Sequence, residues 1–541
     1  MESGRVDGKP RIVWQKYLGT VDAIIKMAEG QEPENPREVD IFELGGATAL
    51  YDIAQRLGLE ETVDEVVPNR EQGPSVGRYM LLAAINRALA PCSKLAIGDW
   101  YGQTVLRRLW RHSSSAFSSQ RFWDHMDMVS QGAIAEIEER LASRIVSVFG
   151  LSHSLLLYDT TNFYTFIATS NERAGLPARG RSKAKRHDLR QVGLALLVAR
   201  DFGIPLMYRL YAGDIPDVSL FPSLAGELLK RYEKLGAGKA DVTLVFDKEN
   251  VSDAAMEELA LQGVHFVTAL SATRDPELLA TPLERFSELE GMPGTRAFAC
   301  SLPLSGRDLR AVVCYSESFF SRQLGGVTSN LARCQTKLKD LESSLLSWRR
   351  GKRRGRKPKP AGVWAKEILA PQFMASLFQT EVSEKEGLPT LAWRLDHDAL
   401  RALAEERLGR TLLVTDRGDW SAREVIGAYR ALSSIEETFR SMKNTHFLSW
   451  QPAWHWTDQK LRVHALYCVL ALTLATLAHK VVTEAGIDLS LAALLKELSA
   501  IREVAIIYPS GRGRGKIILS RMSARQKKLF DLLEIGAFTS R

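Results

Sequence analysis

The stretch LLLYDTTNFYTF, residues 155 to 166, indicates the class of fold that this chain builds. It opens with a short apolar run, typical of a strand buried on both faces, and the run ends at Asp159. The stretch DVTLVFDKEN, residues 241 to 250, repeats this pattern and ends its apolar run at Asp247. Because functional groups of α/β sheets gather at the carboxyl ends of strands, both aspartates are candidates for one site.

The segments between and after these strands give the order of elements. Residues 191 to 213 contain two apolar runs around the turn sequence RDFG, which predicts a hairpin. Residues 219 to 236 and 252 to 263 each end in glycine and predict helices, and residues 265 to 271 predict another strand. The resulting order is strand, strand, strand, helix, strand, helix, strand. It predicts a mixed α/β sheet and matches the ribonuclease-H-like fold.

Changes of pattern along the chain predict five regions. The first 150 residues carry apolar residues at helical spacing, whereas the pattern between the core segments is broken by a basic loop that contains proline and glycine. We therefore expect a mainly helical N-terminal region, a core in two parts, a domain inserted between those parts and a C-terminal region. Their predicted bounds are 1–150, 151–275 with 411–490, 276–410 and 491–541.

Bulk composition narrows the class of protein. The chain has 541 residues, 45% of them hydrophobic, and a net charge of +8, which is compatible with a polyanionic partner. Its five cysteines are scattered, which argues against a disulfide framework or a zinc ribbon. The most apolar stretch, residues 463 to 478, is shorter than a membrane span, so we expect a buried helix and no membrane partner.

Two adjacent acids, Glu436 and Glu437, lie in SSIEETFRSMKN, residues 433 to 444, and helical geometry separates them. If residues 423 to 443 form one helix, Glu436 borders the apolar face, whereas Glu437 is turned about 100° further toward solvent. Glu436 then shares a stripe with a tyrosine and two cations. An ordinary ion pair with Arg440, four residues on, would also account for that stripe.

The stripe has a spacing of its own, because Tyr429, Glu436 and Lys443 follow one another at intervals of seven residues. This Tyr-x6-Glu-x6-Lys pattern resembles the signature of bacterial insertion-sequence transposases of the DDE class, in the group called insertion-sequence family four. The two aspartate stretches also resemble that family's blocks, as do residues 413 to 444, and the resemblance covers roughly 150 to 480. The signature has an arginine three residues after the tyrosine, where this chain has Leu432.

The resemblance implies that Asp159, Asp247 and Glu436 are catalytic and together bind two Mg²⁺ ions, with Mn²⁺ as a substitute. Phosphodiester transfer builds charge on the attacking and leaving oxygens, and two ions about 4 Å apart stabilise both. Mg²⁺ prefers oxygen ligands, which explains acids in place of a His or Cys cluster. Taken singly, each aspartate would also suit a structural role as a strand-end acid that caps a turn.

Cationic side chains provide the expected path for DNA. By resemblance, Tyr429 and Lys443 contact phosphates of the transposon end, and Arg430 or Arg440 replaces the missing arginine; surface packing of the helix is the alternative. Two basic runs, residues 178–190 and 349–359, have the composition of phosphate-binding loops. Solvated loops are the alternative for both runs, and a nuclear-localisation signal for the second. The predicted contacts in the two runs are Arg179, Arg181, Lys183, Lys185, Arg186, Arg349, Arg350, Lys352, Arg353, Arg354 and Arg356.

Three tryptophans, Trp450, Trp454 and Trp456, follow the glutamate helix. We expect them to pack against the next apolar helix, and stacking on an unpaired base is the alternative.

The resemblance and these features together imply a DNA transposase that cuts at the terminal inverted repeats of its own element and transfers the 3′ ends to target DNA, with residues 1–150 used for DNA binding or dimerisation. The expected partner is double-stranded DNA, both the transposon ends and the target. Synapsis of two ends implies a homodimer. The expected location is the bacterial cytoplasm, in association with the nucleoid. Two alternatives stay open: a ribonuclease-H-like endonuclease that does not transpose, and an inactive descendant kept as a DNA-binding protein.

Overall fold

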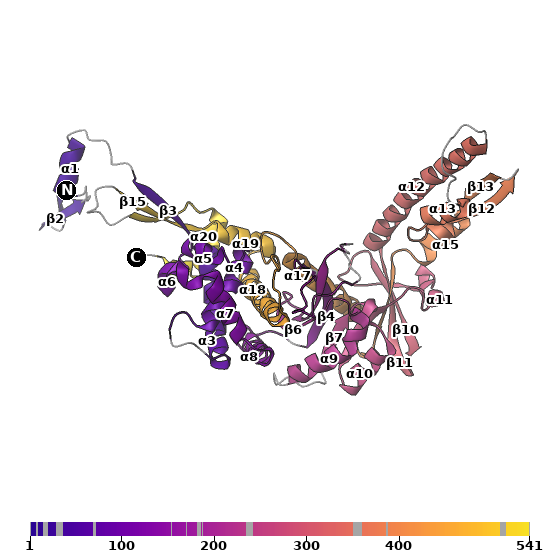
Figure 1. The fold of residues 1–541 in the computed structure, drawn as a ribbon, viewed down its shortest axis with the longest axis horizontal. Coiled ribbons are helices and arrows are strands. Elements are labelled where there is room, and N and C mark those ends of the chain that lie inside the picture. The colour runs from indigo at the N-terminus through magenta and orange to yellow at the C-terminus, as the bar shows by residue number, and fades with distance from the viewer. Residues whose placement is uncertain are drawn as a thin grey trace.

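A nine-stranded mixed sheet forms the centre of the fold, with a helical region on one side and a projecting arm on the other (Figure 1). The computed structural model describes residues 2–6, 9–14, 20–28, 36–68, 72–152, 154–168, 170–180, 186, 188–233, 242–349, 360–385, 388–508 and 516–539. The strand order across the sheet is β6-β5-β4-β7-β8-β14-β11-β10-β9. The strands are β4 (Leu155–Thr165), β5 (Arg190–Ala199), β6 (Pro205–Ala212), β7 (Thr243–Phe246), β8 (His265–Leu270), β9 (Ser287–Glu288), β10 (Thr295–Leu304), β11 (Arg307–Ser316) and β14 (Arg410–Thr415).

The first five strands form where the sequence predicts them, but β4 continues past Asp159 to Thr165, so only Asp247 lies at the carboxyl end of its strand as expected. Strands β4, β5 and β6 are antiparallel neighbours, and the turn between β5 and β6 has positive φ angles at Phe202 and Gly203. Strands β4, β7 and β8 are parallel, because helices α9 (Asp217–Glu233) and α10 (Asp253–Leu261) cross over between β6, β7 and β8. The sheet is thus mixed α/β, and this order is compatible with a ribonuclease-H-like fold.

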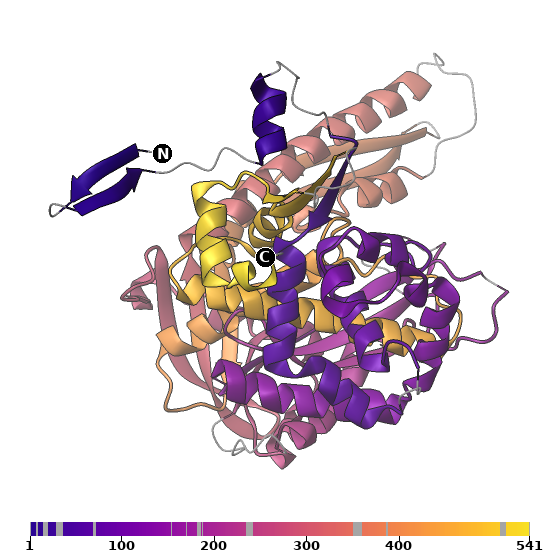
Figure 2. The same ribbon diagram turned by 90° about the vertical axis from the view of Figure 1, so that its left-hand side faces the viewer.

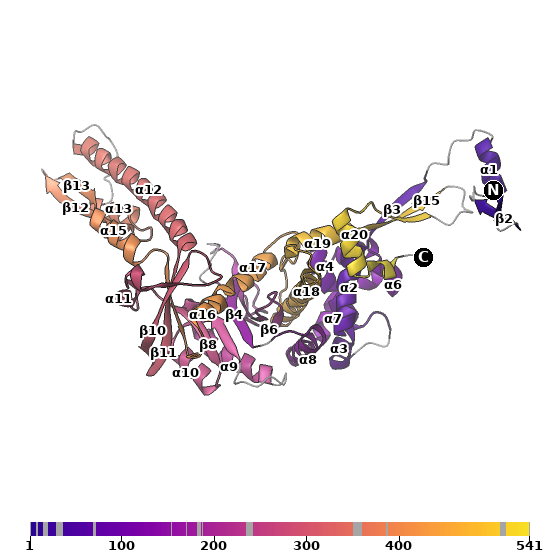
Figure 3. The same ribbon diagram turned by 180° about the vertical axis from the view of Figure 1, so that it is seen from behind.

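The segment predicted as an insertion, 276–410, divides into two parts. After α11 (Pro276–Leu279), its first part supplies β9, β10 and β11 to the main sheet, where β11 pairs with β14. The second part forms a separate hydrophobic core and projects as an arm (Figures 1 and 3). The predicted bounds are therefore too wide, because the apolar face of β11 is buried in the main sheet. The arm consists of α12 (Glu317–Arg349), α13 (Ala361–Ile368), α14 (Met374–Leu377), β12 (Phe378–Lys385), β13 (Leu388–Leu395) and α15 (His397–Glu406).

Residues 423 to 443, predicted as one helix, form two that follow one another (Figure 3). Helix α16 spans Ala422–Arg430 and α17 spans Leu432–Met442. Between them, the Ala431 N–H contacts the carbonyls of both Gly427 and Ala428, which tightens the turn without leaving right-handed helical geometry. The predicted apolar stripe is confirmed, since Leu432, Ile435, Phe439 and Met442 are all buried.

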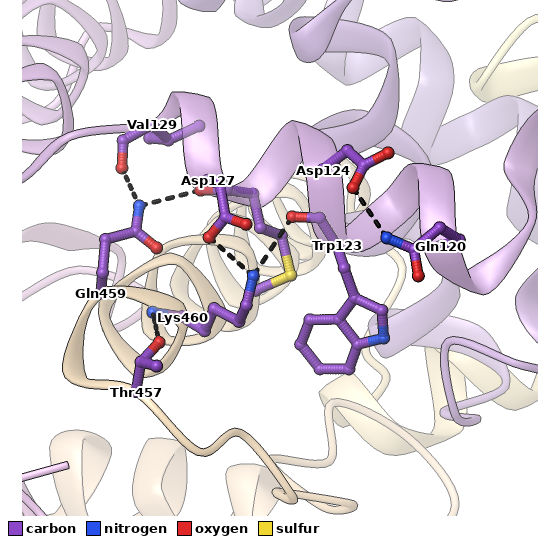
Figure 4. Close-up of polar contacts among 9 residues, drawn as sticks. Gln120, Trp123, Asp124, Asp127, Val129, Thr457, Gln459 and Lys460 are labelled. Carbon is purple, nitrogen blue, oxygen red and sulfur yellow. Dashed lines mark hydrogen bonds and ion pairs between the residues drawn. The ribbon is translucent and has the colours of Figure 1, made fainter. Parts of the chain in front are cut away.

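Helix α18 (Asp458–Glu484) contains the most apolar stretch and packs against the N-terminal helices. It is long and apolar enough to span a membrane by length and composition, yet 89% of its apolar window is buried inside the protein. At its start, Lys460 Nζ lies 2.6 Å from Asp127 Oδ1, and Gln459 Nε2 donates to backbone carbonyls of Met126 and Val129 (Figure 4). The prediction of a buried helix is therefore confirmed.

The N-terminal helices surround α18 and share its hydrophobic core. A second set of helices follows α18 in the C-terminal region. The N-terminal set is α2 (Gly45–Leu57), α3 (Leu59–Val66), α4 (Val76–Leu89), α5 (Ile97–Gly102), α6 (Leu106–Trp110), η1 (Ser114–Phe117), α7 (Ser119–Met128) and α8 (Gln131–Phe149). The C-terminal set is α19 (Leu491–Ser499), α20 (Ala524–Leu532) and η5 (Ile535–Phe538).

The loop between α17 and α18 is fixed to the sheet by Trp450. This side chain is fully buried and stacks on Phe163 of β4 with ring centroids 4.5 Å apart. Trp450 also lies edge-on to His464 of α18, with ring centroids 4.6 Å apart, so the predicted packing against that helix is confirmed for Trp450. Trp454 and Trp456 differ, because their side chains are 57% and 59% exposed and do not enter the core.

The two ends of the chain meet in a three-stranded sheet of order β16-β15-β3. Its strands are β3 (Glu38–Glu43), β15 (Arg502–Ile507) and β16 (Lys516–Leu519), so the predicted regions 1–150 and 491–541 fold together. A hairpin of β1 (Glu2–Val6) and β2 (Lys9–Trp14), followed by α1 (Val21–Ala28), lies away from the rest (Figures 1 and 2).

A buried acid in this terminal sheet gives a test of the arrangement. Glu43 on β3 lies opposite Arg502 on β15, and burial raises the pKa of Glu43 from 4.5 to about 7 although Arg502 opposes the rise. Between these two pH values the unfolded chain ionises Glu43 and the folded chain does not, so stability falls as pH rises. We expect Glu43→Gln to remove this fall, which is worth about 3 kcal/mol.

The measurement is the thermal unfolding midpoint of both proteins at several pH values from 5 to 8. The unfolding midpoint of the variant should rise relative to that of the wild type as pH rises. A difference that stays constant with pH would contradict the burial of Glu43 as an acid.

Candidate active site

The pairing of β4 with β7 brings the two predicted aspartates side by side. Their last parallel pair is Tyr158 with Phe246, and Asp159 and Asp247 are the next residue on each strand. Side chains at the same register of neighbouring strands point to the same face of a sheet, so both carboxylates project together. Both side chains are half-buried, and Asp159 Oδ1 accepts from the Thr160 N–H at 2.7 Å.

Glu436 comes to these aspartates from α17, which packs on β4. The buried face of α17 lies against the sheet and Glu436 lies at its border, exposed to the space between helix and sheet. Glu437 is also exposed, but only Glu436 of the two lines the cleft that contains both aspartates. Helical geometry alone thus separates the two acids as predicted.

A single cleft of about 1020 Å³ contains the three acids. Its floor consists of the middle of β4 and the residues that follow β7. One wall is α16 with α17, and the opposite wall is the first turns of α12 with neighbouring parts of β10, β11 and β14. Apolar side chains line part of it, together with side chains that carry charge, hydroxyl or amide groups. The polar side chains include Asp159, Thr160, Thr161, Asp247, Glu249, Asn250, Thr295, Glu317, Arg322, Tyr429, Arg430, Glu436, Arg440 and Lys443.

Tyr429 faces all three acids. Its hydroxyl donates to Asp247 Oδ1 at 3.1 Å. Burial is the largest cause that raises the pKa of the phenol above its ordinary value of 10.0, and the charges of Asp247, Glu436 and Asp159 raise it further. The phenol is therefore a hydrogen-bond donor across the ordinary pH range, and its donation to Asp247 offsets part of the repulsion among the acids.

Lys443 reaches from the end of α17 to the first aspartate strand. Its Nζ donates to Thr161 Oγ1 at 2.6 Å and lies 5.7 Å from the centroid of the Phe163 ring. Thr161 is two residues beyond Asp159 on β4. Lys443 thus places a positive charge beside the acids and links α17 to the floor of the cleft.

The arginines near the signature occupy different parts of the cleft. Leu432, at the position where the resembling signature has arginine, is buried and cannot donate a hydrogen bond. Arg430 Nη2 donates to Thr295 Oγ1 of β10 at 2.8 Å, so it holds α16 against the opposite wall. Arg440 lines the cleft from the exposed face of α17.

The two basic runs lie mostly outside the described residues. In the first run, Arg179 is exposed, and Arg186 forms an ion pair with Asp188 at 2.7 Å. Arg349 is the last residue of α12, and nothing is described of its side chain. The predicted contacts outside the description are Arg181, Lys183, Lys185, Arg350, Lys352, Arg353, Arg354 and Arg356.

Several residues of the cleft were not predicted from the sequence. Thr161 and Asn250 lie two and three residues after the aspartates, so proximity in sequence was an available signal. Asn250 is buried, and within the part of the chain that the structure describes its Oδ1 has no hydrogen-bond partner. Arg322 carries no such signal, because it enters the cleft only through the position of α12, which begins at the end of the interior strand β11.

The donor set of the cleft suits hard cations. Within the described residues, no group of three or more His, Cys, Asp and Glu side chains is arranged to hold one metal ion. A two-ion site does not require such a group, because Mg²⁺ commonly takes one or two carboxylates and keeps several waters. Carboxylates from β4, the end of β7 and α17, with the unpartnered Asn250 Oδ1 nearby, form an all-oxygen set that fits this chemistry.

Comparison with known proteins found one structural neighbour of interest. No protein-family model matches the chain, and no curated protein matches it. A solved structure of the piggyBac transposase synaptic complex with hairpin DNA is similar over 84% of this chain and 78% of that one, at 11% identity and a TM-score of 0.37. Because a TM-score this low is below the range of a shared fold, the function proposed below rests on the residues of the cleft.

The environment of Tyr429 predicts the titration of its phenol. When the absorbance of Tyr429→Phe is subtracted from that of the wild type, we expect no tyrosinate signal at 295 nm near pH 10. Burial and three carboxylates oppose ionisation of Tyr429. Tyr164, which is half-exposed on the far part of β4, gives a matched control through Tyr164→Phe. A Tyr429 step at pH 10 would show that its hydroxyl does not face the acids.

Proposed function

We propose that this protein is a DNA transposase that cleaves DNA at the terminal inverted repeats of its own element and transfers the 3′ ends to target DNA. The observation that carries the proposal is one cleft lined by Asp159, Asp247 and Glu436 together with Tyr429 and Lys443. These five residues come from three separate parts of the chain. They are also the residues that match the acid triad and the Tyr-Glu-Lys signature of the resembling family.

The chemistry of the cleft supports phosphoryl transfer. When bound, two Mg²⁺ ions held by Asp159, Asp247 and Glu436 would stabilise charge on the attacking and leaving oxygens and activate the attacking water or 3′ hydroxyl. Mn²⁺ has similar ligand preferences. The three acids act as ligands, and the hydroxyl of Tyr429 fixes the rotamer of Asp247 through its hydrogen bond.

The cations of the cleft suit a polyanionic substrate. Arg440 lies one turn after Glu436 on α17 and Lys443 follows at the end of this helix, so a phosphate next to the scissile bond would meet positive charge on this wall. The basic runs at 178–190 and 349–359 would extend this path along double-stranded DNA, and their contribution would fall steeply with salt.

The remaining parts of the proposal concern organisation. Strands β4 to β8 correspond to a ribonuclease-H-like core, and the arm from α12 to α15 corresponds to a domain inserted before the glutamate helix. The helical region around α18 would bind the element ends and form a homodimer that brings two ends together. Its place of action would be the bacterial cytoplasm, at the nucleoid.

The paired acids of α17 provide the sharpest mutational test. Glu436→Gln should lose more than about a hundredfold in both nicking and strand transfer, because a metal ligand loses its charge. Glu437→Gln is the matched control, since it removes the same charge one residue away and outside the cleft, and it should act like the wild type. The assay uses duplexes that carry the repeats flanking the gene, with Mg²⁺.

The outcomes separate the candidate functions. Loss in Glu437→Gln with full activity in Glu436→Gln would sink the assignment of the acid. Nicking without joining by the wild type would favour an endonuclease that does not transpose, and binding without either step would favour an inactive DNA-binding descendant.

Removal of the metal gives a second test. We expect EDTA to abolish nicking and joining while leaving most DNA binding in place, because the cations rather than the acids hold the phosphates. Added Mn²⁺ in excess of EDTA should restore both steps. Unchanged cleavage in EDTA would overturn the metal-ion mechanism.

A further inference from the structure

Leu432 leaves a gap in the cation set of the cleft. In the signature that this chain resembles, the third residue after the tyrosine is arginine. This chain has Leu432 at that position, and its side chain lies on the buried face of α17. Arg430, one candidate substitute, is hydrogen-bonded to Thr295 on the far wall. Lys443 is hydrogen-bonded to Thr161 on the floor. Arg430 and Arg440 are both exposed on the wall formed by α16 and α17, and of the two Arg430 is already hydrogen-bonded across the cleft.

The opposite wall provides a guanidinium from a different part of the chain. Arg322 lies in the second turn of α12, is exposed and lines the same cleft. Its Cζ lies 5.2 Å from the centroid of the Phe319 ring, one turn earlier on the helix. This contact limits the rotamers of the side chain, and the N–H donors of the guanidinium lie around its edge.

The charges near Arg322 favour an anionic ligand over an internal ion pair. Glu317 lines the same wall, yet within the described part of the chain Arg322 forms no ion pair with it or with any other acid. The acids Asp159, Asp247, Glu249 and Glu436 occupy the floor and the other wall. A DNA strand that crosses this floor is repelled by them unless cations contact its phosphates on both sides.

We propose that Arg322 binds a phosphate of the DNA strand in the cleft from the α12 wall, and so supplies the guanidinium that Leu432 cannot. This inference rests on the proposed function, since it takes DNA as the occupant. The inferred contact makes α12 a part of the substrate site. The arm that begins with α12 then helps to position the DNA strand. Because a guanidinium fork contacts two phosphate oxygens where an ammonium is a point charge, lysine should replace Arg322 only in part.

The test measures binding of full-length protein to a duplex carrying the element end, in EDTA, over a series of salt concentrations. Arg322→Ala should weaken binding and lower the slope of log K against log salt by about 0.9, the value for one phosphate contact. Arg322→Lys should keep the slope and bind with intermediate affinity. The matched control is Arg333→Ala, because Arg333 is exposed on the same helix, outside the cleft, and hydrogen-bonded to Asn330; it should behave as the wild type.

A slope and an affinity of Arg322→Ala equal to those of the wild type would overturn the inference. Thermal unfolding of each variant separates misfolding from lost contact, and if Arg322→Ala unfolds early, the slope of Arg322→Gln decides the question in its place. If the wild type binds and cuts the element end and Arg322→Ala has the same affinity and slope, only this inference is refuted. A wild type that does not bind the duplex at all refutes the proposed function together with it.

Discussion

The candidate site depends on the register of two parallel strands. Tyr158 pairs with Phe246, and this pairing alone places Asp159 beside Asp247 on one face of the sheet. Because side chains alternate along a strand, a slip of one residue would send one of the two acids to the other face. The apolar runs before each aspartate are buried at every position, so contacts on both faces of the sheet hold the two strands in place. Burial of the apolar residues that precede each aspartate thus fixes the position of its carboxylate.

The third acid is held by a different kind of constraint. Helix α17 buries one apolar face on the sheet, and Glu436 lies at the border of that face. The Lys443 contact with Thr161 and the Trp450 stack on Phe163 hold the far end of the helix and its following loop to the same strand that carries Asp159. Three carboxylates directed into one cleft repel one another, and the donors of Tyr429 and Lys443 offset part of that cost. A concentration of like charge that the chain stabilises at this place is typical of a functional site.

The parts of this arrangement that depend on local pattern could be predicted from the sequence. Apolar runs ending in Asp159 and Asp247 gave the strands, and helical spacing distinguished Glu436 from Glu437. The break at Ala431 was missed because helix spacing cannot show a single tightened turn. The edge of the inserted segment was missed because the pairing of β11 with β14 joins residues far apart in the chain. Arg322 was missed for the same reason, since nothing near it in sequence reveals that α12 begins at the cleft. Trp454 and Trp456 carried a pattern compatible with both packing and exposure, and packing was the wrong choice for them.

The central claim is that Asp159, Asp247 and Glu436 together hold the metal ions at which DNA is cut. Anomalous scattering from crystals of the protein with an element-end duplex and Mn²⁺ tests it most directly, because it locates the ions without reference to activity. The account predicts Mn²⁺ peaks in the cleft, in contact with carboxylate oxygens of all three residues. In the Glu436→Gln variant, the contact between Mn²⁺ and residue 436 should be lost. Peaks elsewhere, or a cleft that stays without Mn²⁺ in crystals whose protein still cuts the duplex, would contradict it.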